Sequence, residues 1–68
     1  MLQDEEALAA RRAFAQLGEA DRDLLELRVI AGLSFEQAAA VLGRRAASLR
    51  TAQSRALARL RALLDEER

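Results

Sequence analysis

Three glycines constrain the fold of this chain more than any other feature. Gly18, Gly32 and Gly43 each follow a run of strong helix formers, and the sequence contains no proline. Glycine readily adopts the left-handed conformation that ends many helices, so each of the three is interpreted as a helix stop. The segments between them predict an all-α domain of four helices. We expect these helices at about 4–17, 19–31, 35–42 and 46–66.

The composition excludes several classes of protein. The 68 residues allow one domain at most, spanning 1–68, with only a small core. Histidine and cysteine are absent, which removes the commonest general base, thiolate metal ligands and disulfides. No apolar run approaches the roughly 18 residues that cross a membrane, and no signal peptide is visible. We therefore expect a soluble, cytoplasmic protein that is not an enzyme and needs no metal, cofactor or small-molecule substrate.

Positive and negative charges are segregated along this chain, although its net charge is zero. Residues 1–43 contain eight acids and four arginines, which gives −4, whereas residues 44–68 contain seven arginines and three acids, which gives +4. From Arg44 to Arg61 there are six arginines and no acid. An ordinary surface helix would gain from Glu–Arg pairs one turn apart, and this segment has none. The asymmetry predicts a basic surface on the last helix.

The second and third predicted helices supply most of the core. The second is the most apolar, and we expect five large side chains to form the centre of the core: Leu24, Leu25, Leu27, Val29 and Ile30. Ser34 precedes the third helix and Gln37 follows three residues later, a spacing that predicts a capping box. The inward face of the third helix is predicted to contain Phe35, Ala38, Ala39 and Leu42. Its alanines would let another helix approach closely.

The fourth helix has a clear division of faces when its residues are placed at steps of about 100°. One side is predicted to face the core: Ala46, Leu49, Gln53, Ala56, Leu57, Leu60, Leu63 and Leu64. The opposite side has only small residues: Ala47, Thr51, Ser54 and Ala58. Arginines flank this strip, with Arg50 and Arg61 on one edge and Arg44, Arg55 and Arg59 on the other. Small residues between basic edges suit a helix that enters a DNA groove between phosphates.

The third helix, the turn at Gly43 and the fourth helix together predict a helix-turn-helix at about 34–61. Such turns often contain glycine. The second helix of the motif presents its N-terminal residues to base edges while the first crosses the backbone. This pattern favours DNA binding, although helical hairpins in ordinary bundles share it.

These segments resemble region 4 of bacterial sigma factors, and in particular the extracytoplasmic-function group. The segment LLELRVIAGLSFEQAA, from Leu24 to Ala39, looks like the second and third helices of that region. Val41-Leu42-Gly43 and the segment from Arg50 to Arg61 continue the resemblance, which covers about residues 14–64. The resemblance implies recognition of the −35 promoter element and docking on the β flap of RNA polymerase. It also implies possible masking by an anti-sigma factor.

The resemblance also implies which side chains face DNA. The matching positions are Arg45, Ser48, Arg50, Thr51, Ser54 and Arg55. Arg59 and Arg61 are expected to touch phosphate or remain solvated, and Arg44 lies on the same basic edge as Arg55 and Arg59. Arg45 stands where the family usually has a capping Ser or Thr, so the cap is lost and a positive charge opposes the helix dipole. Gln53 stands where the family often has an apolar residue, so its amide needs a partner.

Two alternatives remain at this point. A LuxR-type regulator shares a Gly-Leu-Ser junction like that of residues 32–34 and would bind operators as a dimer. A protein-interaction bundle would instead use the arginine edges to bind an acidic partner such as an anti-sigma segment. Nothing in the chain resembles region 2, which a working sigma factor also needs. We therefore expect the chain to be one domain of a longer protein.

Overall fold

The computed structural model describes residues 2–67, which form five helical segments. In chain order they are α1 (Leu2–Ala15), α2 (Glu19–Leu25), the π-helix η1 (Glu26–Ile30), α3 (Phe35–Leu42) and α4 (Ala46–Glu67). The expected all-α class is confirmed. Within residues 2–67 there is no strand, and none of the helices is long and apolar enough to cross a membrane.

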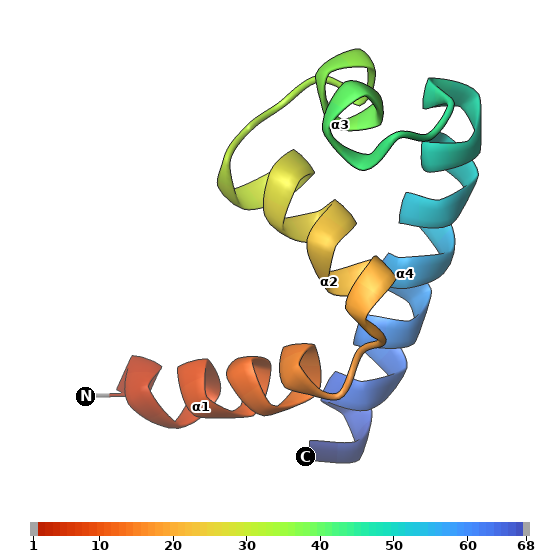
Figure 1. Cartoon of the computed structure of the whole chain (residues 1–68). Coiled ribbons are helices and arrows are strands. Elements are labelled where there is room, and N and C mark those ends of the chain that lie inside the picture. Colours follow the sequence, from red (N-terminus) through yellow and green to blue (C-terminus); the bar gives the residue numbers. More distant parts are fainter. Residues whose placement is uncertain (1, 68) are drawn as a thin grey trace.

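The long helix α4 is the axis on which the other helices are arranged (Figure 1). α1 packs near its C-terminal end, α3 packs near its N-terminal end, and α2 with η1 lies between them. The result is elongated, measuring 38 × 21 × 15 Å. Its radius of gyration is 12.9 Å, whereas a compact chain of this length would have about 11 Å. The domain therefore exposes more surface than a compact chain of the same length would.

The core consists of two small hydrophobic clusters. The lower cluster contains Leu17, Leu25 and Ala56, with Phe14, Leu60 and Leu63 packed against it. The upper cluster contains Leu24, Ala38 and Leu49, with Leu27, Phe35, Ala39, Leu42 and Ala52 packed against it. Leu24 and Leu25 are neighbours in sequence but lie in different clusters. α2 therefore connects the part of the domain that contains α1 to the part that contains α3.

The second predicted helix does not continue as an α-helix to Ala31. From Glu26 it becomes the π-helix η1, in which the amide of Ala31 donates to the carbonyl of Glu26 at 2.9 Å. The wider turn changes the direction in which the following side chains point. Val29 is 65% exposed and Ile30 is 75% exposed, so the expectation that both lie in the core is wrong. A π-helix often marks a functional position, and η1 leads into the loop before α3.

Two of the three glycines end their segments as predicted. Gly32 has φ +73° and Gly43 has φ +66°, the left-handed conformation expected of a helix stop. Gly18 does not, because its backbone is extended with φ −62° and ψ 157°, and it caps the start of α2 instead. α1 already ends at Ala15, and the short turn after it places Leu17 in the lower cluster.

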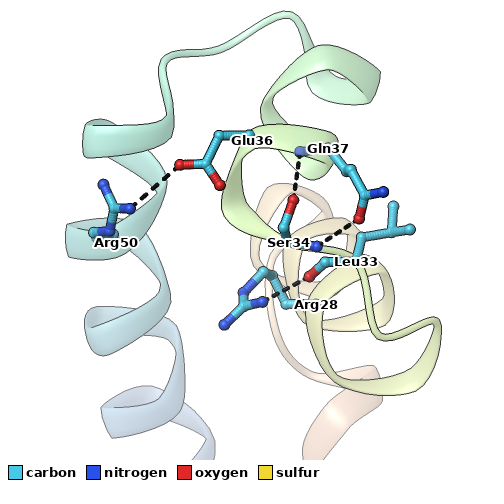
Figure 2. Close-up of polar contacts among 6 residues, drawn as sticks. All are labelled: Arg28, Leu33, Ser34, Glu36, Gln37 and Arg50. Atoms are coloured by element: carbon cyan, nitrogen blue, oxygen red, sulfur yellow. Dashed lines mark hydrogen bonds and ion pairs between the residues drawn. The ribbon is translucent and has the colours of Figure 1, made fainter.

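The capping box at the start of α3 is confirmed (Figure 2). The amide of Gln37 donates to the Ser34 hydroxyl oxygen at 3.0 Å, and the amide of Ser34 donates to Gln37 Oε1 at 2.8 Å. Two free amides of the first turn are thereby satisfied. The start of α3 is fixed by local sequence.

Arg28 joins three segments of the upper half of the domain. Its Nη1 donates to the carbonyl of Leu33 at 2.6 Å, which ties η1 to the loop before α3 (Figure 2). Its Nε donates to Gln53 Oε1 at 2.9 Å, which ties η1 to α4 and gives Gln53 the partner that it needs. The guanidinium carbon also lies 3.8 Å from the centre of the Phe35 ring, a cation–π contact. One half-buried side chain thus fixes where α3 lies against α4.

Replacing Arg28 with Ala should lower the free energy of unfolding by about 2–4 kcal/mol, because two charge-assisted hydrogen bonds and a cation–π contact are lost together. Urea denaturation followed by helical circular dichroism would measure the change. Arg61→Ala is the control, since Arg61 is exposed on α4 and its loss should change stability by less than about 0.5 kcal/mol. Equal stability of the two variants would show that the Arg28 contacts are not stabilising.

Candidate nucleic-acid interface

A tight turn joins α3 to α4 and produces a helix-turn-helix. The amides of both Gly43 and Arg44 donate to the carbonyl of Ala39, which closes the end of α3 in a Schellman-like turn. Ala38 and Leu49 are fully buried against each other's helices in the upper cluster. The prediction that small residues on α3 allow a close approach is therefore confirmed. This approach fixes the direction in which the N-terminal half of α4 leaves the turn.

The predicted DNA-facing residues lie together on the outer side of this hairpin. All eight are exposed on α4 or immediately before it: Arg44, Arg45, Ser48, Arg50, Thr51, Ser54, Arg55 and Arg59. Ala47 and Ala58, the other small residues of the predicted strip, are exposed as well. The fold thus leaves a narrow strip of small side chains uncovered between arginines. That these residues contact DNA stays a prediction.

The inner side of α4 differs from its predicted pattern at two positions. Leu49 and Ala56 are buried, as expected. Leu57 is 43% exposed, so its placement in the core is wrong, because the neighbouring helices leave this edge of the stripe open. Ala52 was not predicted to pack inward, yet it lies against the upper cluster. The stripe on α4 that faces the core is therefore shifted toward Ala52 near its N-terminal end.

Two arginines of α4 have acidic partners on other helices. Arg59 Nη1 lies 2.8 Å from Asp21 Oδ2 of α2, and the Asp21 side chain is only 16% exposed. Arg50 Nη2 lies 3.4 Å from Glu36 Oε2 of α3 (Figure 2). The segment from Arg44 to Arg61 contains no acid. Both acidic partners therefore come from other helices, which the tertiary structure places against α4. Arg59 therefore holds α2 against α4 in addition to any contact with phosphate.

Three other arginines at this end of the domain are not neutralised in this way. Among the described residues, Arg44, Arg45 and Arg55 form no ion pair, and all three are exposed. Arg44 and Arg45 precede the first turn of α4, which contains no acid. The positive end of the helix dipole adds to their charge. The start of α4 therefore carries positive charge that favours the binding of an anion.

Arg45 occupies the N-cap position of α4 without supplying a cap. Its carbonyl accepts the first helical hydrogen bond, from the amide of Leu49 at 3.1 Å. Its side chain is a cation that cannot accept from the free amides of the first turn. The free domain thus carries an unfavourable charge at this position, and a phosphate there would relieve it.

The variant Arg45→Ser should raise the free energy of unfolding by about 1 kcal/mol, because serine caps the helix and the opposing charge is gone. The same change should reduce the salt dependence of DNA binding by about one released ion. Denaturation and binding titrations at several salt concentrations would measure both. Arg44→Ser removes an adjacent charge outside the cap position, and an equal gain in stability there would contradict a capping effect.

A groove lies on another face, between α1, α2, η1 and the C-terminal half of α4. It has a volume of about 590 Å³. Its apolar lining includes Phe14, Ile30, Leu60 and Leu64. The groove was not predicted from the sequence, because it forms only when the helices pack and Ile30 was expected to lie in the core. The exposed Ile30 side chain is accounted for by this groove.

The short α3, the glycine turn and the longer α4 with its exposed arginines define a protein of the helix-turn-helix class. The family described as sigma-70, region 4 matches residues 7–60. The chain belongs to this family, and the resemblance inferred from the sequence is confirmed. The LuxR-type alternative is not favoured.

A curated relative supports the same conclusion. The chain is 44% identical over 61 residues to the ECF RNA polymerase sigma factor ShbA of Streptomyces griseus subsp. griseus. The matched part covers 90% of this chain and 32% of that relative. The chain therefore spans about a third of the length of the sigma factor it matches. No solved structure matches the chain.

Proposed function

We propose that this domain recognises the −35 promoter element as region 4 of an RNA polymerase sigma factor and so directs transcription initiation. Membership in the sigma-70, region 4 family supports the proposal. The observation that carries it is the outer strip of α4, where small exposed residues lie between arginines at the end of a helix-turn-helix. In this motif the second helix lies in the major groove. A cytoplasmic location follows from this role.

The proposal gives the exposed residues different tasks. Arg50, with Ser48, Thr51 and Ser54, lies near the start of α4 and is assigned to base edges. Arg44, Arg45 and Arg55, which have no acidic partner among the described residues, are assigned to phosphates or to bases beside them. Arg59 uses one donor on Asp21 and has others left for a phosphate.

Arg50→Ala should weaken binding to the preferred duplex by about 1–3 kcal/mol and flatten the preference at one base pair. Arg61→Ala is the matched control, because Arg61 lies on the same edge of α4, further from its start. Its loss should weaken binding to all duplexes alike, if at all. Fluorescence anisotropy with preferred and scrambled duplexes would measure both variants. An unchanged preference in Arg50→Ala would contradict the assignment of this residue to bases.

The apolar groove is the proposed docking site for the β flap of RNA polymerase. It is lined by residues of α1, α2, η1 and α4, and none of the arginines assigned to DNA is among these lining residues. An apolar helix seated there would cover Ile30 and Leu60. DNA and polymerase could then be bound at the same time.

Ile30→Asp should weaken binding to RNA polymerase core enzyme by about tenfold or more, because a charge would be buried in an apolar interface. The fold should be unaffected, since Ile30 is mostly exposed. Val29→Asp is the matched control, because Val29 is the adjacent residue, is similarly exposed and does not line the groove. Pull-down of core enzyme at graded concentrations would compare them. Equal losses in the two variants would place the docking site elsewhere.

An anti-sigma factor is a further proposed partner. The arginines of α4 that are assigned to DNA offer a basic surface to an acidic segment. Such a partner would compete with the promoter for the same side chains, so masking would need no separate site.

A further inference from the structure

The acid nearest to the proposed base-reading arginine is Glu36. It lies in the first turn of α3, where a carboxylate is favoured by the helix dipole. Its Oε2 lies 3.4 Å from Arg50 Nη2, and both side chains are largely exposed, at 71% and 57% (Figure 2). An exposed pair of this kind contributes little to stability. If Arg50 enters a DNA groove, the neighbouring Glu36 carboxylate would repel the phosphates.

Arg50 also lies close to an aromatic ring that it shares with another arginine. The guanidinium carbons of Arg28 and Arg50 lie 3.8 and 5.0 Å from the centre of the Phe35 ring. Arg28 is held by Gln53 and by the carbonyl of Leu33, so it cannot move aside. Two cations near one ring repel each other. Without an acid beside it, Arg50 is the one that would swing away.

We infer that Glu36 is a positioning residue that holds Arg50 in the orientation in which it reads a base. The carboxylate engages one terminal nitrogen of the guanidinium, and the ring limits its rotation. The guanidinium has five N–H donors, so the remaining ones stay free for the two parallel hydrogen bonds that guanine accepts. The cost of a negative charge near DNA is offset by a pre-oriented arginine. This inference rests on the proposed recognition of DNA by α4.

The experiment compares the base preferences of variants with a pool of duplexes randomised over one turn of the helix. Bound duplexes are recovered and sequenced, and the affinity for the unselected pool is measured in parallel. The variants are Glu36→Ala, Glu36→Gln, Arg50→Ala and the double variant Glu36→Ala with Arg50→Ala. Glu66→Gln is the charge control, since it removes an acid about 30 Å along α4 from the turn. Circular dichroism establishes that each variant is folded.

Glu36→Ala should bind the unselected pool more tightly, because a repulsive charge is gone. Its preference at the base pair read by Arg50 should fall about fivefold or more, the ratio expected for a weakened bidentate contact. Glu36→Gln should keep part of the preference, since its amide oxygen still accepts a hydrogen bond. The double variant should show no less preference than Arg50→Ala alone, because the two residues act as one unit.

Different outcomes would overturn the inference and the proposed function. If the original chain and Glu66→Gln show a base preference that Glu36→Ala retains in full, Glu36 acts only through its charge and the inference is wrong. If the double variant loses base preference by the sum of the two single losses, the two residues act independently and the inference is also wrong. If the original chain shows no base preference at all, the proposed recognition of DNA fails, and the positioning role fails with it.

Discussion

The guanidinium of Arg28 is the contact on which the geometry of the helix-turn-helix depends. It donates hydrogen bonds to the carbonyl of Leu33 in the loop and to Gln53 of α4. It also makes a cation–π contact with Phe35 of α3. The upper cluster behind it is built around only three buried residues. So few apolar contacts cannot by themselves fix the angle between two helices. A directional hydrogen-bonding group placed where η1, α3 and α4 meet supplies the missing specificity.

Some arginines of α4 join it to other helices, whereas Arg45 at its start lowers stability and is available to bind DNA. Arg59, paired with Asp21, joins α4 to α2, and Arg50, paired with Glu36, joins it to α3. Arg45 forms no ion pair within residues 2–67 and occupies a cap position that a neutral polar residue would fill better. The N-terminal end of α4 thus gives up stability for a concentrated positive charge. Such exchanges between stability and function are common at binding sites.

The elongated shape has a related consequence. Two small clusters leave Ile30 and Leu57 exposed, and Ile30 lies in the groove proposed for polymerase. A domain with a thin core gains stability whenever a partner covers such surface. The sigma factor that this chain resembles is about three times its length, so region 4 there is part of a larger protein. Docking on polymerase and stabilisation of the domain are expected to be coupled.

Local signals in the sequence determined much of this fold. The helical class, the capping box of Ser34 and Gln37, and the left-handed turn at Gly43 were all predicted, because each depends on residues within a few positions of one another. The outer strip of α4 followed from helical periodicity alone. The apolar composition of its segment also assigned Ile30 to the core, which was wrong. The acidic partners of Arg50 and Arg59 were not predicted, since the segment from Arg44 to Arg61 contains no acid. The ion pairs with Glu36 and Asp21 and the apolar groove arise from contacts between separate helices, and the π-helix η1 interrupts an otherwise helical pattern without a signal in the sequence. Only the tertiary structure decided these features, because a linear pattern carries no record of which helix faces which.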